Sequence, residues 1–262
     1  MGCVLAQNHV LSLDGDGDYV ALPQAIIDGD EFAIEAWFFL LGDGGGMDQQ
    51  NMIFAQRTNA TECYHSAVIL VAKSLPELPN CSFTVRTDQD CSENTNSPYP
   101  GTGLWHHVVG VKENQMIHLY VDGELVSSSP YTQTGSFASN IDYVDIGRHR
   151  HTSQNHGYFF GLIDELRIWD YALNQNEIGS RMYEELQGNE QGLLAYWNFE
   201  DSEDQVVDQS GNGHNGSYMG GAHVLEAQLP TPIGFDMLGD FNQDGQLNIS
   251  DIIQLVNYIL DN

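Results

Sequence analysis

Basic side chains are scarce in this sequence. Eight Lys+Arg residues stand against 37 Asp+Glu residues, which gives a formal net charge of −29 at pH 7. Proteins that bind nucleic acid rely on Lys and Arg contacts to phosphates, so this composition excludes nucleic acid as the expected partner. Acidic loops instead suit hard cations such as Ca²⁺, which prefer oxygen ligands.

Long hydrophobic runs are also missing. No run reaches the ~18 apolar residues that a membrane-spanning helix needs. Val4, Leu5 and Ala6 resemble the end of a signal peptide that is cleaved before Gln7. Residues 1–6 are therefore interpreted as the remnant of such a peptide, and the mature protein is expected to be secreted.

The chain has only four cysteines, and cleavage would remove Cys3. Two predicted strands, 64–72 and 81–88, flank a turn-forming segment with two prolines. If they form a hairpin with Ala72 opposite Cys81, Cys63 lies opposite position 90. This register predicts a Cys63–Cys91 disulfide with Cys81 free, and Cys81–Cys91 is the alternative pairing. Either disulfide fits an oxidising compartment.

Familiar catalytic motifs are absent. The sequence has no Gly-x-Ser-x-Gly, no His-Glu-x-x-His and no activated Cys–His signature. No predicted strand carries the alternating carboxylates that a glycosidase of jelly-roll fold would direct into a cleft. The glycine-rich run at residues 42–46 lacks a Lys and a following helix, so it is not a phosphate loop. We therefore expect no enzymatic activity.

What the sequence does contain is a series of short β-rich runs separated by Gly, Asp, Asn and Pro, which is typical of an all-β sandwich. Residues 116–121 alternate clearly and end at an Asp122-Gly123 hairpin turn. One helix is predicted to begin at the cap Asn174 and to end at Gly188. The clearest strands are expected at residues 19–22, 32–40, 51–56, 68–72, 82–86, 106–112, 116–121, 144–147, 159–169 and 193–199.

Seven short motifs follow one another in a characteristic order: LDGDGDYV (13–20), FAIEAW (32–37), WHHV (105–108), LYVDG (119–123), DIG (145–147), GLIDELRIW (161–169) and DQSGNG (208–213). Together they closely resemble bacterial laminin-G-like, concanavalin A-like jelly-roll domains. The resemblance covers residues 7–227 and implies a two-sheet antiparallel sandwich. It also implies recognition of carbohydrate or protein outside the cell, often with a bound calcium.

A second resemblance follows a linker at residues 228–238. Residues 239–262 resemble one dockerin type I repeat, an EF-hand-like loop followed by a helix. Dockerins normally carry two such repeats and bind cohesin domains, so a cohesin-like partner is one expectation for this tail. The spacing places oxygen ligands for Ca²⁺ at Asp240, Asn242, Asp244, the Gln246 carbonyl, Asn248 and Asp251.

A second calcium is predicted in the sandwich. In a regular strand, Asp164 shares a face with Leu166 and Ile168, and a carboxylate on a core face must be paired, neutral or metal-bound. The resemblance places the loop of Asp14, Asp16 and Asp18 close to this strand, so the proposed ligands are Asp164 and carboxylates or carbonyls of this loop. The alternative is that Asp164 accepts backbone hydrogen bonds and the Asp-Gly run is a turn.

Several other residues have predicted roles. Glu35 and Arg167, each two residues before a Trp, are expected to form a partly buried ion pair. Arg148, His149, His151 and His156 form a cationic segment, interpreted as a ligand-contacting rim loop, with a transition-metal site or a solvated loop as alternatives. Tyr99 and Tyr131 are expected to be surface aromatics near the ligand.

These observations predict a calcium-binding recognition module for glycans or extracellular proteins. The alternative is a structural or assembly subunit, such as a homo-oligomer, that uses the dockerin-like tail for attachment. The sequence does not identify the ligand, because specificity in this fold lies in loops whose arrangement the sequence order does not give.

Overall fold

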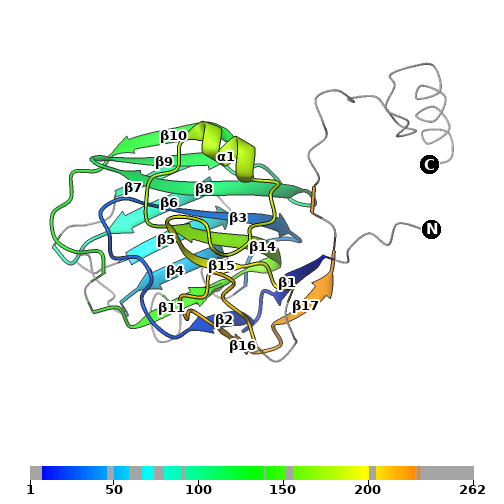
Figure 1. The fold of residues 1–262 in the computed structure, drawn as a ribbon. Helices are drawn as coiled ribbons and strands as arrows, with labels where there is room; N and C mark the ends of the chain where they lie inside the picture. Colours follow the sequence, from blue (N-terminus) through cyan, green and yellow to red (C-terminus); the bar gives the residue numbers. More distant parts are fainter. Residues whose placement is uncertain are drawn as a thin grey trace, which may run out of the picture. The chain divides into compact units, whose positions relative to one another are not determined.

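The computed structural model describes residues 8–45, 50–58, 67–73, 80–89, 93–138, 140–150, 156–200, 205–227 and 229–230. The chain divides into two compact units, Met1–Leu229 and Pro230–Asn262. The first unit is built from two stacked antiparallel β-sheets (Figure 1). In the described residues, this confirms the predicted all-β sandwich with one short helix.

Sheet A has eight strands, in the order β10-β9-β8-β3-β14-β1-β17, with β15 paired to β14 beside β1. Every pairing in it is antiparallel. The bounds are β10 (Glu124–Pro130), β9 (Met116–Val121), β8 (Trp105–Glu113), β3 (Phe32–Leu40), β14 (Phe160–Trp169), β1 (His9–Asp14), β17 (His223–Glu226) and β15 (Leu193–Trp197).

Sheet B has seven strands, in the order β16-β2-β11-β4-β5-β6-β7. A separate two-stranded hairpin, β12-β13, follows β11. The bounds are β16 (Ser217–Met219), β2 (Tyr19–Leu22), β11 (Tyr143–Ile146), β4 (Asn51–Arg57), β5 (Ala67–Lys73), β6 (Asn80–Arg86), β7 (Glu93–Pro98), β12 (Arg148–Arg150) and β13 (His156–Tyr158).

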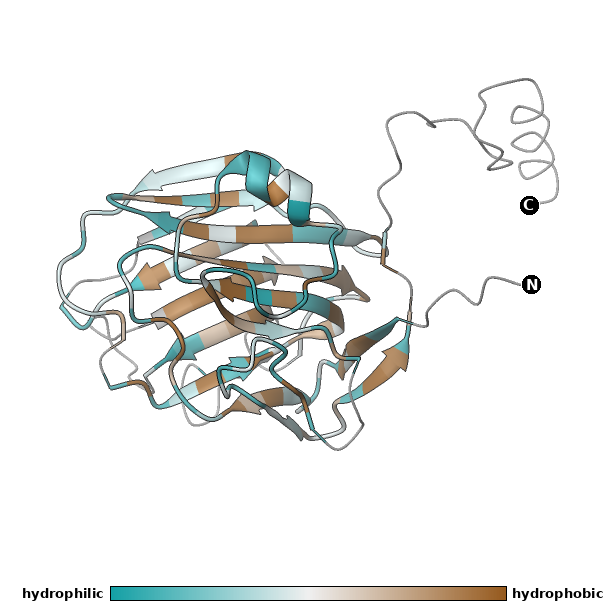
Figure 2. Ribbon diagram, in the orientation of Figure 1, coloured by the Kyte–Doolittle hydropathy of each residue, from teal (hydrophilic) through white to brown (hydrophobic). Residues whose placement is uncertain are grey.

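The main core lies between the two sheets. On β9, Ile117, Leu119 and Val121 join this core while Tyr120 belongs to a second cluster on the other face, as the alternation predicts. Asp122 and Gly123 both have positive φ, 51° and 82°, which is the geometry of the predicted two-residue turn. Figure 2 shows hydrophobic residues concentrated along the strands and hydrophilic residues in the loops.

The helix α1 (Gln175–Arg181) packs on the outer face of sheet A, where Ile178 is buried against Val109 and Trp169. Its predicted capping box between Asn174 and Glu177 is present. The helix ends earlier than expected, at Arg181 rather than near Gly188. Two side chains of sheet A donate hydrogen bonds to the carbonyls at the end of the helix. Arg167 donates to the carbonyl of Arg181, at 3.0 Å, and Trp37 donates to that of Met182, at 2.7 Å.

The β5–β6 hairpin is consistent with the predicted register: Val71 pairs with Ser82, the last pair of this ladder, and one further step along the same register would set Ala72 opposite Cys81. Cys81 is a free, buried cysteine whose thiol donates to the carbonyl of Val71 at 3.2 Å. Cys63 and Cys91 lie outside the described residues, so the disulfide between them stays a prediction. No helix in the described part of the chain is long and apolar enough to cross a membrane.

Candidate ligand-binding sites

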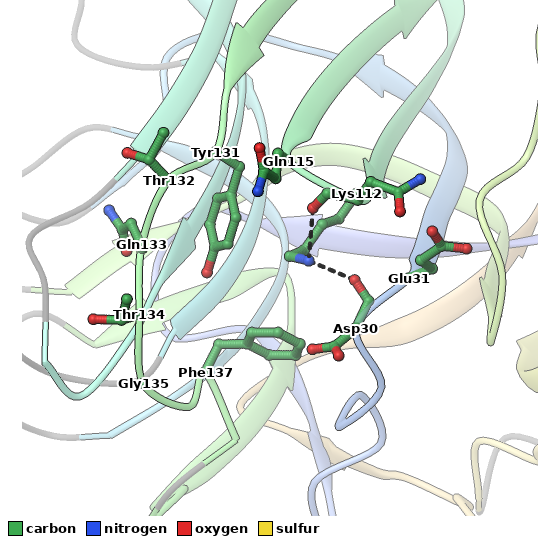
Figure 3. A pocket seen from close by; sticks show the side chains of 11 residues that line it. Asp30, Glu31, Lys112, Gln115, Tyr131, Thr132, Gln133, Thr134, Gly135 and Phe137 are labelled. Carbon is green, nitrogen blue, oxygen red and sulfur yellow. Dashed lines mark hydrogen bonds between the residues drawn. The ribbon is translucent and has the colours of Figure 1, made fainter.

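A pocket of about 400 Å³ opens at one end of the sandwich. It lies where the segment before β3, the turn between β8 and β9 and the segment after β10 meet (Figure 3). Lys112, at the end of β8, is only 4% exposed and holds these segments together. Its ammonium group donates to the carbonyls of Asp30 and Asn114 and lies 4.7 Å from the centre of the Tyr131 ring. Burial lowers the pKa of Lys112, although Asp30 and Glu31 oppose the shift.

This pocket, which we call the rim pocket, has an aromatic floor and a polar rim. Tyr131 and Phe137 are 6% and 5% exposed, whereas Gln115, Thr132 and Thr134 are exposed at the rim. The prediction that Tyr131 is a surface aromatic is therefore wrong. Tyr131 is a largely buried ring that lines the pocket. Tyr99 is partly buried and packs against the main core. Lys112 had no predicted role, because its contacts come partly from two loops that are distant from it in the sequence.

The cationic segment lies on the outer face of sheet B. The guanidinium of Arg148 lies 2.6 Å from the carboxylate of Asp145 and 3.3 Å from the ring centre of Tyr19. Arg148 is thus a buried structural residue, 7% exposed, rather than the predicted ligand contact. Burial raises the pKa of Asp145 to about 6, although Arg148 and Arg150 lower it.

His149 is also buried, at 5% exposure, and its Nε2 accepts a hydrogen bond from Arg57 at the end of β4. His156 pairs with Arg150 across the β12-β13 hairpin. His151 lies outside the described residues. Among the described residues, no group of three or more His, Cys, Asp or Glu side chains is placed to hold a metal ion.

The predicted sandwich calcium site is not assembled. Asp14 pairs with Phe160, four residues before Asp164 on β14, which corresponds to roughly 13 Å along the strand. A β-bulge also changes the direction of the Asp164 side chain. Asp164 pairs with Trp37 and Arg167 pairs with Glu35, so β14 has one residue more than β3 between these two pairs. The extra residue lies at Glu165, whose φ is 50°. Asp164 therefore lies on the face opposite to Leu166 and Ile168.

The carboxylates have other partners instead. Asp164 is fully buried and accepts hydrogen bonds from the Asn8 side chain and the Glu165 backbone, at 2.9 and 2.8 Å. Burial, together with Glu165 and Glu200, raises its pKa well above the ordinary value. Asp18 accepts from the backbone of Asp14 and of Gly221. Asp16 is exposed, and its backbone donates to Asp14. This arrangement corresponds to the alternative reading, a hydrogen-bonded turn, and the four residues do not fit one shared calcium site.

The predicted ion pair between Glu35 and Arg167 is confirmed. Their side chains lie on neighbouring strands, with Nη1 and Oε1 3.5 Å apart. His107 and Trp169 also contact the Glu35 carboxylate, at 3.2 and 2.9 Å. This network holds the segment after α1 to sheet A and lies away from the pocket residues.

The two stacked antiparallel sheets define a β-sandwich protein. The family model Laminin_G_3, described as the concanavalin A-like lectin/glucanases superfamily, matches residues 14–179, more than half of the chain. The chain therefore belongs to this family, as the motif series predicted. A search of curated proteins found no match.

Several solved structures align with this chain. A protein of Bacteroides ovatus ATCC 8483, designated a candidate carbohydrate-binding protein, aligns with a TM-score of 0.66 at 19% identity. The alignment covers 88% of this chain and 63% of that chain, so this chain spans less than two thirds of its length. The heptameric pentraxin of Limulus polyphemus aligns with a TM-score of 0.49 at 13% identity over 68% of this chain and 82% of that chain. Domains LG4-5 of mouse laminin α1 align with a TM-score of 0.46 at 16% identity, over 73% of this chain and 47% of that chain.

Proposed function

We propose that this protein is a glycan-binding module that holds a sugar in the rim pocket. The observation that carries the proposal is the combination of an aromatic floor with a rim of amides and hydroxyls. Amide and hydroxyl groups both donate and accept hydrogen bonds, as sugar hydroxyls do, and the small exposed parts of the two rings add an apolar patch at the base of the pocket. A volume of about 400 Å³ lies within the usual range for small-ligand sites.

The way Lys112 is held supports a preformed site. Its buried ammonium group joins the three segments that form the pocket, and the backbone of Tyr131 also donates to the carbonyl of Gln115 at 2.6 Å. A pocket that is ordered before the ligand arrives loses less conformational entropy on binding. The designation of the Bacteroides ovatus relative as a candidate carbohydrate-binding protein agrees with this proposal.

Further parts of the proposal concern the setting of this module. We propose that it is secreted, that it acts by binding rather than by catalysis, and that the tail loop from Asp240 to Asp251 takes up calcium. The acidic composition and the oxygen ligands at each loop position support the last point.

A glycan array followed by titration calorimetry tests the function. We expect saturable binding of at least one glycan, and about two- to tenfold weaker binding for Gln115→Ala and Thr132→Ala, since each removes one hydrogen-bonding group. Gln175→Ala, which removes an exposed amide on α1, is the matched control and should bind like the parent. Unchanged affinity in both pocket variants would contradict the assignment of the pocket.

A further inference from the structure

The charges that line the rim pocket are unequally accessible. The charged lining residues are Asp30, Glu31 and Lys112. Lys112 is buried, and its ammonium group already donates to two backbone carbonyls. Asp30 is exposed and Glu31 is partly exposed. A ligand in the pocket therefore meets two carboxylates, whereas the positive charge of Lys112 is withdrawn behind its carbonyl partners.

The two carboxylates keep their hydrogen-bonding capacity. Asp30 holds Lys112 through its backbone carbonyl and not through its side chain. In the described part of the chain, no hydrogen bond or ion pair engages the carboxylate of Asp30 or of Glu31. Both charges are nevertheless close enough to oppose the lowering of the Lys112 pKa by burial. Each carboxylate can thus accept hydrogen bonds from a ligand without giving up a contact of the fold.

The acidic residues and the hydroxyl groups occupy different sides of the pocket. Asp30 and Glu31 belong to the segment before β3, and Thr132 belongs to the segment after β10. Figure 3 shows Thr132 across the pocket from the two acidic residues. One side of a bound sugar would therefore face negative charge, and the other side would face neutral hydrogen-bonding groups.

We propose that the rim pocket selects a sugar with a free amino group, whose ammonium lies at Asp30 and Glu31, and rejects sugars that carry a carboxylate. This inference rests on the proposed glycan-binding function and names the class of sugar. An ammonium group has three donors and no acceptor, so it matches two carboxylates through charge-assisted hydrogen bonds. A carboxylate at the same place would be repelled by two like charges. The net charge of −29 favours the same choice from a longer distance.

Titration of the intact protein with matched small sugars tests this specificity. The probes are the methyl glycosides of glucosamine, N-acetylglucosamine, glucose and glucuronic acid, together with the same four forms of galactose. Monosaccharides are used because a polymeric amine would bind a protein of this charge at many places. At about pH 6 the amine is protonated. In at least one series we expect the amino form to bind about three- to tenfold more tightly than the hydroxyl and acetamide forms, with the acid weakest. Ligand-observed NMR measures such weak affinities.

Two substitutions assign the preference to the pocket. Asp30→Asn and Glu31→Gln keep the side-chain size and remove one charge each, and Asp30→Asn retains the backbone carbonyl that holds Lys112. Each should reduce the preference for the amino form over the hydroxyl form by about threefold. Glu226→Gln removes an exposed charge outside the pocket lining and should leave the preference unchanged. Added salt should reduce the preference of the parent, because it screens exposed charges. Melting curves establish that each variant is folded.

The possible outcomes separate this inference from the proposed function. Binding of a neutral glycan with no preference for its amino form would overturn the inference and leave the glycan-binding function standing. A preference that survives both pocket substitutions would overturn the assignment to Asp30 and Glu31. Nα-acetyl-lysine amide has an ammonium group but no sugar ring, so its binding as tightly as the amino sugar would overturn the sugar assignment. Binding of no glycan at all would overturn both proposals.

Discussion

The guanidinium of Arg167 and the carboxylate of Glu35 face each other on β14 and β3, 3.5 Å apart, and each side chain is about 1% exposed. Removal of Arg167 would leave the buried carboxylate of Glu35 without its arginine partner. It would also release the segment after the helix, because Arg167 donates to the carbonyls of Arg181 and Glu184. We expect Arg167→Ala to lower the free energy of unfolding by about 3–5 kcal/mol. Denaturant titration measures this. Arg181→Ala, at a partly exposed guanidinium, should cost no more than about 1 kcal/mol; equal losses would contradict the prediction.

Glu35 should make the free energy of unfolding depend on pH. Burial raises the pKa of Glu35, but the contact with His107, the charge of Arg167 and the hydrogen bond from Trp169 lower it more, to about 2. Since the folded-state pKa is below the ordinary 4.5, the unfolded chain takes up a proton first as the pH falls. Above about pH 4.5, Glu35 thus makes its full contribution of about 3 kcal/mol to the free energy of unfolding. This contribution is lost as the pH falls toward 2. Unfolding curves between pH 6 and pH 2 should show that the deficit of Glu35→Gln relative to the parent shrinks with falling pH; a constant deficit would show that the carboxylate does not have this role.

Gly110 provides space where the two sheets meet. A Cβ at this position of β8 would overlap with the Phe83 ring on β6. Gly110→Ala should therefore lower the free energy of unfolding by about 1–3 kcal/mol through overpacking. Phe83→Leu, combined with Gly110→Ala, should give a smaller loss than the sum of the two single changes. Additive losses in this double-mutant cycle would mean that the ring is not the obstacle.

Cysteine labelling tests the predicted disulfide. Burial raises the pKa of Cys81 to about 12, so its thiol should not react with iodoacetamide in the folded protein and should react after denaturation. Peptide mapping without reduction should recover Cys63 linked to Cys91, a bridge that contributes about 3 kcal/mol by the chain-entropy relation. Recovery of Cys81 in a linked peptide would favour the alternative pairing.

Calcium titration tests the tail loop. We expect one calcium site in the intact chain, lost in Asp240→Ala and in Asp244→Ala because each removes a carboxylate ligand. Asp236→Ala, just before the loop, is the matched control and should bind like the parent. Asp164→Asn should leave the stoichiometry unchanged, because Asp164 is not brought together with Asp14, Asp16 and Asp18. Binding that survives both loop substitutions would place the calcium elsewhere.

The sequence predicted the elements whose pattern is local. Residues 116–121 alternate cleanly, and residues 32–40 are predicted with the bounds that β3 has. The Glu35–Arg167 pair could be predicted because each residue stands at the same offset from a Trp. The edge strands β7 and β10 were missed, since their polar sequences show no hydrophobic pattern and their pairing depends on a neighbouring strand.

The functional sites could be predicted only in part, because they depend on register. One inserted residue at Glu165 reverses the direction of Asp164, and no motif marks that bulge. The pocket likewise requires Lys112 to meet loops from two distant parts of the chain.

The pairing of β1 with β17 has a mechanical consequence. His9 lies opposite Glu226, and Ala227 donates to the carbonyl of Asn8 at 2.9 Å, so the two ends of the sandwich leave from the same point of one sheet edge. Tension applied through those ends would pull the strands apart across their hydrogen bonds, which would then break one after another rather than together. The sandwich should therefore open at low force from this edge, while sheet B keeps its strand pairings.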